Sequence, residues 1–468
     1  MKQIMLLVAG CWLLGTCSFG QTIAQKIQKA FTAFEKDSQL KHAISSLYVI
    51  DASTGQVVFD KNSQIGLAPA STQKIITSVT AFELLGKDYR YKTYFTAGRG
   101  NYKINKLINL EILATGDPTF GSWRFDKKFE KNLFDSLQQN FKRKGINKIG
   151  MIDGSTLWEQ DNSIPDGWIY QDIGNYYGAG AKGLNWHENQ YDLILIPGKE
   201  VGDPVSVDTT FPNAGKDFLT SGLATGPKGS GDNAFIYFVD SRYYILRGTI
   251  PAGVDKFTIS GSLLEPEAVL MYALKDFLDK ANLRQSFTDD YWFSVNTSTK
   301  TIEGKEIVYT HYSPTLDSII YWFNKRSINL YGEALIKTFA YEKNGFGSTD
   351  SGVAVVQKFW KEKGMDEDEL GIVDGSGLSP LNRVTTHAQA EILKYAKTKD
   401  WFPYFYTSLP EYNGMKMKSG TIRGVKGFCG YHKAKNGKEY IFSFLVNNYN
   451  GSSSSLVSKM YKVLDILK

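Results

Sequence analysis

The sequence predicts an α+β fold in which a long β-rich insert divides one domain into two segments. Near each end of the 468-residue chain, helix-like runs accompany paired strand-like runs. Between residues 91 and 310 the sequence pattern changes, because short β-like runs alternate with turn-rich segments. We therefore expect residues 21–90 and 311–468 to form one discontinuous domain, and residues 91–310 to form an inserted region of two subdomains.

Composition indicates a folded protein without nucleic-acid partners. Apolar residues make up 42% and aromatic residues 14% of the chain, which is enough for a sizeable core and excludes disordered and collagen-like classes. The net charge of +6 is too dilute over this length to indicate nucleic-acid binding, and no basic cluster with interleaved aromatics occurs.

Residues 1–20 have the pattern of a signal peptide. Lys2 is followed by an apolar run over 4–14, and Ser18-Phe19-Gly20 is a cleavage-like site. The run is too short to cross a bilayer core of about 30 Å as a helix. We expect an exported, periplasmic protein without a stable transmembrane anchor.

The cysteines leave a second possibility for this leader. Val8-Ala9-Gly10-Cys11 and Leu14-Gly15-Thr16-Cys17 both resemble lipidation motifs, so a lipid anchor at Cys11 or Cys17 is the alternative to ordinary cleavage. Only Cys429 remains once the leader is removed, which excludes an intramolecular disulfide in the mature chain.

The segment after the leader predicts a helix, two strands and a second helix. Alternation over 44–50, a turn at 53–55 and a run over 56–59 predict the paired strands. A helix is expected over 71–85, ending at Gly86. The first helix is predicted from apolar residues that recur at helical spacing, namely Ile23, Ile27, Ala30, Phe31 and Phe34.

The insert is predicted to be rich in short strands. The segment 220–232 is rich in Gly, Ser and Thr and is expected to be a surface loop, and a helix is expected over 267–281. Strand-like runs cover 107–113, 191–196, 234–239 and 243–247.

The last third of the chain returns to helices and paired strands. Helices are expected over 316–323 and 330–340, and a hairpin over 428–446 with its turn at Asn436-Gly437. The final helix, over 456–467, has one apolar face. We expect this face to pack on the terminal sheet, with a membrane surface as the alternative.

Ser71-Thr72-Gln73-Lys74 places a hydroxyl and an amine one helical turn apart, on the same face. A serine needs an adjacent base to become a nucleophile, and a buried lysine near another cation can serve once its pKa falls. The tetrad alone is weak evidence, because Ser38-Gln39-Leu40-Lys41 repeats it in a surface-like segment.

Two further motifs are also ambiguous when taken alone. Ser327-Ile328-Asn329 opens a helical run, where a helix cap is the simpler reading, and Ser294-Val295-Asn296 has the same spacing. Lys418-Ser419-Gly420-Thr421 precedes the hairpin, where an ordinary lysine on an edge strand is the simpler reading.

The order of the three motifs resembles that of penicillin-binding proteins and class A β-lactamases. Further segments make the chain similar to the class C low-molecular-mass penicillin-binding proteins, the D-alanyl-D-alanine carboxypeptidase/endopeptidases. They are Gly116-Asp117-Pro118-Thr119, Gly167-Trp168, 174–179, Asn185 with Glu188-Asn189, Ser313-Pro314, 329–335 and 374–379. The resemblance implies a penicillin-binding/serine β-lactamase-like transpeptidase fold, a sheet flanked by helices, with the insert.

The resemblance also implies roles for individual residues. Ser71 would be the acylated nucleophile with Lys74 as its base, and their chemistry would need no metal or other cofactor. Ser327 and Asn329 would relay protons and orient the substrate amide, and Lys418 would support the relay.

Substrate contacts follow from the same resemblance. Ser419, Gly420 and Thr421 lie where the family binds the terminal carboxylate, and the backbone N–H groups of Ser71 and Thr421 would form the oxyanion hole. Asp153 would meet the amino group of meso-diaminopimelate, although a turn carboxylate beside Gly154 is the simpler reading.

Three positions depart from the family pattern. Ile328 stands where Asp or Asn is frequent, Ser419 replaces a threonine, and Pro380 stands where some relatives have arginine. The five histidines, at positions 42, 187, 311, 387 and 432, lack metal-site spacing.

The function that we expect is a serine-type DD-peptidase acting on the stem peptides of peptidoglycan, with β-lactams as covalent inhibitors. The first alternative is a β-lactamase or esterase of the same fold. The second is a module that senses β-lactams or binds the cell wall without catalysis.

Overall fold

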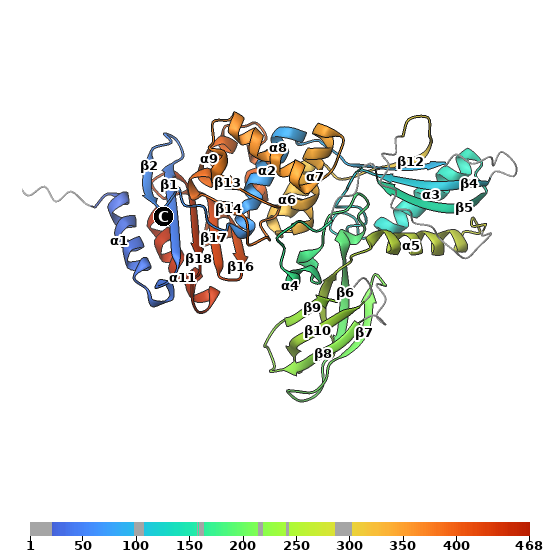
Figure 1. Cartoon of the computed structure of the whole chain (residues 1–468), viewed down its shortest axis with the longest axis horizontal. Coiled ribbons are helices and arrows are strands. Elements are labelled where there is room, and N and C mark those ends of the chain that lie inside the picture. The colour runs from blue at the N-terminus through green and yellow to red at the C-terminus, as the bar shows by residue number, and fades with distance from the viewer. Residues whose placement is uncertain are drawn as a thin grey trace, which may run out of the picture.

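We analysed a computed structural model, which describes residues 21–97, 107–156, 158, 163–213, 219–239, 243–285 and 302–468. The expected signal peptide with Cys11 and Cys17, and the Ser294-Val295-Asn296 motif, lie outside the described residues. The molecule is elongated, with a main body that carries both terminal segments, one lobe at the opposite end and another lobe below (Figure 1).

The main body is built on a six-stranded antiparallel sheet that combines both ends of the chain. The central pairing joins β1 to β18, from Ile44 opposite Asn447 to Asp51 opposite Tyr440. In spatial order the strands are β15 (Glu411–Tyr412), β16 (Met415–Ile422), β17 (Val425–Lys433), β18 (Glu439–Asn447), β1 (Ile44–Asp51) and β2 (Val57–Lys61).

Helices cover both faces of this sheet. Along β1, Leu47 and Val49 belong to one core, and Tyr48 and Ile50 to the other, as the two-residue period of a strand requires. On the first face lie α1 (Ile23–Glu35) and α11 (Ser453–Leu464). The second core contains α2 (Lys74–Leu85), α6 (Leu316–Lys325), α7 (Asn329–Asn344), α8 (Thr349–Glu362), α9 (Thr386–Lys397) and α10 (Phe402–Ser408).

The predicted first and last helices are confirmed. Phe31 and Phe34 of α1 and Leu456 and Met460 of α11 are buried in the same core cluster. The apolar face of the last helix therefore packs in the protein, as expected, rather than facing outward.

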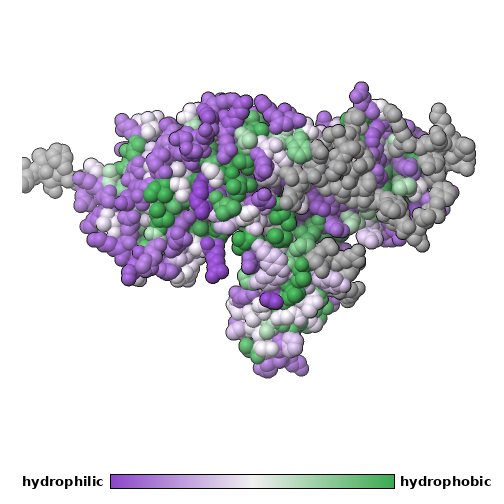
Figure 2. Space-filling model, viewed as in Figure 1, coloured by the Kyte–Doolittle hydropathy of each residue, from purple (hydrophilic) through white to green (hydrophobic). Residues whose placement is uncertain are grey.

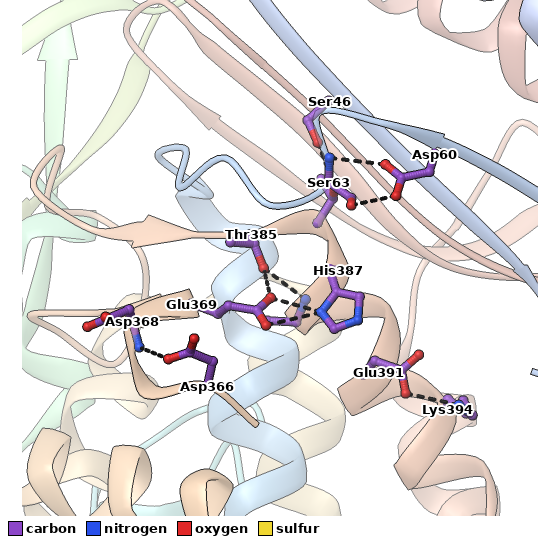
Figure 3. A network of polar contacts seen from close by, with 12 residues as sticks. Ser46, Asp60, Ser63, Asp366, Asp368, Glu369, Thr385, His387, Glu391 and Lys394 are labelled. Carbon is purple, nitrogen blue, oxygen red and sulfur yellow. Dashed lines mark hydrogen bonds and ion pairs between the residues drawn. The ribbon is translucent and has the colours of Figure 1, made fainter. Parts of the chain in front are cut away.

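Polar contacts join the N-terminal strands to the C-terminal half of the main body. Ser46 Oγ of β1 lies 2.6 Å from Thr386 Oγ1, at the start of α9. Beside it, the Glu369 carboxylate accepts hydrogen bonds from Thr385 and lies 2.9 Å from Nδ1 of His387 (Figure 3). This network fixes α9 against the sheet.

The end lobe contains a mixed sheet in the order β12-β3-β4-β5, in which β4 and β5 are parallel. Its core includes Phe95, Ile112, Leu137 and Leu274. Its elements are β3 (Lys92–Ala97), β4 (Leu107–Ala114), β5 (Lys148–Thr156), β12 (Glu306–Tyr312), α3 (Phe129–Lys144) and α5 (Pro266–Lys280).

The lower lobe contains two three-stranded sheets, β11-β6-β7 and β8-β10-β9, around a core that includes Leu193, Leu223 and Leu246. Its strands are β6 (Gln190–Ile196), β7 (Ser206–Phe211), β8 (Leu219–Gly226), β9 (Asn233–Phe238), β10 (Tyr244–Pro251) and β11 (Phe257–Ser262). Outside these sheets, the chain also forms the short helix α4 (Tyr170–Ile173) and the two short paired strands β13 (Leu370–Gly371) and β14 (Arg383–Val384).

The surface loop expected over 220–232 is wrong for most of its length. Residues 219–226 form β8, which pairs in parallel with β10 along its whole length. Leu223 and Thr225 are buried, so packing and pairing overrode the turn-like composition of the segment.

No helix in the described part of the chain is both long enough and apolar enough to cross a membrane.

Replacing Phe31 tests whether α1 contributes to the stability of the main body. Its fully buried ring contacts Phe59 of β2 and Phe444 of β18 at centroid distances of 5.3 and 5.7 Å. Phe31→Ala is expected to lower the free energy of unfolding by about 3–5 kcal/mol in urea denaturation, because it leaves a cavity. Tyr272→Ala, at a side chain that is 70% exposed, is the control, with an expected change within about 0.5 kcal/mol. A loss below about 1 kcal/mol for Phe31→Ala would contradict the role of α1.

Candidate active site

Ser71 and Lys74 lie at the junction of a 3₁₀ turn and a helix. The turn η2 covers Ala70–Gln73, and α2 begins at Lys74, so the predicted helix over 71–85 starts in a tighter turn. Ala70 has a φ of 47°, in the left-handed region that residues with a side chain rarely occupy. Backbone strain of this kind is frequent next to functional groups.

The Lys74 amine is fully buried and has three oxygen neighbours. Its Nζ lies 2.9 Å from Ser71 Oγ, 2.6 Å from Asn329 Oδ1 and 2.8 Å from the backbone oxygen of Ser376. A neutral amine satisfies this geometry, since two N–H groups reach Asn329 and Ser376 while the lone pair accepts the hydroxyl proton of Ser71.

Burial holds the pKa of Lys74 well below its usual value, and the nearby Lys418 lowers it further. The carboxyl groups of Asp374 and Glu333 oppose this shift. Burial also raises the pKa of Glu333 to about 8, with the charge of Asp374 as the next cause. The raised pKa favours the neutral form of Glu333, which holds the proton of Lys74 less strongly than a charged carboxylate would.

Asp374 supports the backbone around this amine. Its carboxylate accepts hydrogen bonds from the backbone N–H groups of Gly377 and Ser379 at 2.7 Å, and from the Trp168 indole at 3.0 Å. The side chains of Gln73 and Asn382 also donate to it. The segment that supplies the Ser376 carbonyl to Lys74 is thus fixed by a buried, fully hydrogen-bonded carboxylate.

Ser327 and Asn329 lie together where α7 begins, but not as helix caps. The cap position is Ile328, which makes no side-chain capping bond, and Ser327 has a left-handed φ of 57°. The Asn329 amide donates to the backbone oxygen of Tyr177 at 2.8 Å. The simpler reading of this motif, a helix cap, is wrong, because the Asn329 side chain contacts the Lys74 amine and the Ser327 side chain contacts the Lys418 amine.

Lys418 is also buried, so the reading of an ordinary lysine on an edge strand is wrong. Its side chain in β16 is 1% exposed, and its Nζ donates to Ser327 Oγ at 2.9 Å and to the backbone oxygen of Ser419 at 2.8 Å. Burial lowers the pKa of Lys418 to about 7; the Cys429 thiol opposes this shift, and the charge of Lys426 adds to it.

Gly420 allows β16 to approach the turn that carries Ser71. A Cβ atom here would lie 2.6 Å from the backbone oxygen of Pro69 and 3.0 Å from the backbone nitrogen of Ser71. Only glycine fits this contact without a shift of the backbone. The next residue, Thr421, accepts a hydrogen bond from Lys426 at 2.7 Å through its Oγ1.

A cavity of about 790 Å³ opens over these groups. Ser71, Ser327, Asn329 and Thr421 line it, whereas Lys74, Lys418, Ser419 and Gly420 do not. Figure 2 shows hydrophobic residues gathered where the lower lobe meets the main body. The other lining residues from the main body and the insert include Arg124, Asp172, Tyr177, Glu188, Gln190, Tyr237, Arg326, Pro380 and Arg423.

Asp153 does not line this cavity. It lies inside β5 of the end lobe, opposite Glu111 of β4, so the reading of Asp153 as a turn carboxylate is wrong. The acidic residues that do line the cavity are Asp172 and Glu188. Burial raises the pKa of Asp172 to about 6, and a hydrogen bond from the Tyr177 hydroxyl opposes the shift.

Within the described residues, no group of three or more His, Cys, Asp or Glu side chains is arranged to hold a metal ion.

Sequence reasoning missed two buried acidic residues near Lys74, Glu333 and Asp374. Both lie in segments that were noted as family landmarks, but no role was assigned to either residue.

Comparisons with known proteins show which proteins the chain resembles in sequence and fold. The D-alanyl-D-alanine carboxypeptidase of Actinomadura sp. (strain R39) is 25% identical over 461 residues, which covers 91% of this chain and 82% of that protein. The crystal structure of penicillin binding protein 4 (dacB) from Haemophilus influenzae superimposes with a TM-score of 0.77 at 18% identity, covering 94% and 98% of the two chains. The same protein complexed with a novel β-lactam gives 0.72 at 17% identity, covering 95% and 99%.

These matches confirm the predicted α+β fold. The D-Ala-D-Ala carboxypeptidase 3 (S13) family matches residues 27–465, nearly the whole chain. The chain therefore belongs to this family of D-Ala-D-Ala carboxypeptidases.

Proposed function

We propose that the chain is a serine-type DD-peptidase that cleaves peptidoglycan stem peptides through an acyl-enzyme on Ser71. The observation that carries this proposal is the buried Lys74 amine, with a lowered pKa, 2.9 Å from a hydroxyl at the cavity wall. A neutral amine in this position is a general base for the serine. Family membership supports the choice of D-Ala-D-Ala as the substrate.

In the acylation step, the Ser71 hydroxyl gives its proton to Lys74 while Oγ attacks the carbonyl carbon of the penultimate D-Ala. The negative charge on the carbonyl oxygen is stabilised by the backbone N–H groups of Ser71 and Thr421. As the C–N bond breaks, the proton that Lys74 received passes through Ser327, which Lys418 contacts at 2.9 Å, to the amine of the departing residue, and Lys74 becomes neutral again. Water then attacks the ester carbonyl and gives a proton to Lys74. As the C–O bond breaks, Ser71 Oγ takes that proton, and the peptide leaves with a new carboxyl group.

The carboxylate of the leaving residue would bind at Ser419 and Thr421, beside Gly420. Lys426 holds the Thr421 hydroxyl at 2.7 Å and adds a positive charge at this end of the cavity. The same contacts accept a free terminal D-Ala, in the carboxypeptidase reaction. They also accept the D-centre of a cross-linked diamino acid, in the endopeptidase reaction.

We also infer the setting in which this enzyme works. Residues 21–90 and 311–468 would form the catalytic domain, and 91–310 the insert. Export to the periplasm follows from the signal-like pattern of residues 1–20. β-Lactams would acylate Ser71, because their strained amide resembles D-Ala-D-Ala.

Incubation with a labelled penicillin tests the nucleophile. The adduct is located by mass spectrometry, and D-Ala release from a muropeptide pentapeptide is followed in parallel. We expect a stable adduct on Ser71 together with D-Ala release, and neither in Ser71→Ala. An adduct on another residue would refute the proposal, rapid loss of the adduct would favour a β-lactamase, and an adduct without peptide turnover would favour a sensor.

Replacing Lys74 tests whether its amine is the base that accepts the proton of Ser71. Lys74→Met is expected to slow acylation by penicillin by about 10²- to 10⁴-fold, because the serine loses its proton acceptor. The time course of adduct formation measures this rate. Lys41→Met is the matched control, because Ser38 and Lys41 repeat the tetrad at exposed positions. Acylation of Lys74→Met at the wild-type rate would rule out the amine as the base.

The lowered pKa of Lys418 predicts a pH-dependent stability. An unfolded lysine keeps its proton to about pH 10, whereas Lys418 in the folded protein loses it above about pH 7. Between these values the unfolded state binds more protons, so this residue makes the free energy of unfolding rise with pH, by up to about 1.4 kcal/mol per pH unit.

The measurement is urea denaturation at several pH values between 7 and 10. The difference between wild type and Lys418→Met should grow with pH in favour of the wild type, while the difference between wild type and Lys41→Met gives the baseline. A flat difference for Lys418→Met would mean that Lys418 stays charged in the folded protein.

A further inference from the structure

An arginine on the cavity wall is fixed by a buried carboxylate that the proposed reaction does not use. Glu188 is 2% exposed, and both of its carboxylate oxygens lie 3.0 Å from Arg124 Nε. The hydroxyl groups of Ser122 and Tyr331 donate to the same carboxylate at 2.6 and 2.7 Å. The buried charge of Glu188 is therefore stabilised by hydrogen-bond donors from three residues. Arg124 uses only its Nε nitrogen to bind this carboxylate.

The remaining face of the guanidinium is available to a ligand. Arg124 lines the cavity, its side chain is 22% exposed, and no described residue accepts a hydrogen bond from its two terminal nitrogens. Its guanidinium carbon lies 5.3 Å from the ring centroid of Trp123 and 6.0 Å from that of Trp322. These contacts orient the planar guanidinium group of Arg124. Because the side chain is already held in place, it loses less conformational entropy when it binds an anion.

A structural role alone does not account for this arrangement. Buried ion pairs can often be replaced by apolar residues without loss of stability, so an ion pair at a cavity wall needs another reason. Two other arginines, Arg326 and Arg423, line the same cavity. No described carboxylate pairs with either of them, so Arg124 is the one that is held in a fixed orientation.

We propose that the terminal nitrogens of Arg124 bind a carboxylate of the stem peptide, upstream of the scissile bond. This inference rests on the proposed function, which assigns the downstream carboxylate to β16. Arg124 belongs to the other wall, because it packs on Trp322 of α6 and its partner Glu188 is held by Tyr331 of α7. A guanidinium fork matches a carboxylate with two parallel hydrogen bonds.

The test compares peptides that end in D-Ala-D-Ala and differ only in whether an upstream acidic residue carries a carboxylate or its amide. The wild type is expected to cleave the carboxylate form with a kcat/KM about 10- to 100-fold higher, through charge-assisted hydrogen bonds. Arg124→Gln should lose this preference by slowing cleavage of the carboxylate form alone. Arg124→Lys keeps the charge but not the fork, and should retain only part of the preference.

Arg247→Gln is the matched control, because this arginine also lies over an aromatic ring, Tyr237, but does not line the cavity. It should leave the preference unchanged. Acylation by penicillin, which lacks the upstream peptide, should proceed at the wild-type rate in Arg124→Gln and shows that the site is intact.

Three results would overturn the inference: no carboxylate preference in the wild type, a preference that survives in Arg124→Gln, or an equal loss for both peptides in that variant. Failure of the wild type to be acylated by penicillin and to release D-Ala would instead refute the proposed function. The two failures are therefore distinguishable.

Discussion

The candidate site depends on the burial of one amine. Lys74 has no contact with water, so every group that it can bond must come from the protein. Its hydrogen-bond partners come from η2, from the start of α7 and from the segment at Ser376, which are far apart in the sequence. The amine is satisfied only when these three segments are assembled, and its low pKa is therefore a property of the complete main body.

Close backbone contacts make this assembly possible. A Cβ atom at Gly377, whose φ is 82°, would lie 2.0 Å from the backbone oxygen of Ala70, and one at Gly375 would lie 2.2 Å from that of Gly332. Together with Gly420, these contacts bring β16 against η2, and the segment around Ser376 against both η2 and α7. Glycines that sequence analysis noted only as parts of motifs are thus the positions where backbones meet.

Local patterns predicted the elements well, because they report on burial within one helix or strand. The amphipathic pattern of α1 and the alternation in β1 are both borne out by the two cores of the sheet. Patterns could not predict that β1 pairs with β18, about 400 residues away, because such a pairing leaves no local signal. The composition of 219–226 was misleading for the same reason, since its pairing with β10 decided its conformation.

The candidate site was predictable in unequal parts. Spacing alone indicated that Ser71 and Lys74 share a helix face, whereas the meeting of Asn329 and Lys418 with them could be expected only from the resemblance to a family. The sequence context of Asp153, an acidic residue beside a glycine, did not indicate its position inside β5 and away from the cavity lining. Glu333 and Asp374 were missed because their importance lies in burial below Lys74, which no spacing rule reports.

The segment between the two parts of the main body contributes directly to the geometry of the candidate site. The Asn329 amide donates to the backbone oxygen of Tyr177, which belongs to the insert. Because its nitrogen is held there, its Oδ1 must face Lys74, at 2.6 Å. The insert also provides Glu188, which accepts a hydrogen bond from Tyr331 of α7. A main body without the insert would keep Ser71 and Lys74 one turn apart, but it would lose the contact that orients the Asn329 amide toward the Lys74 amine.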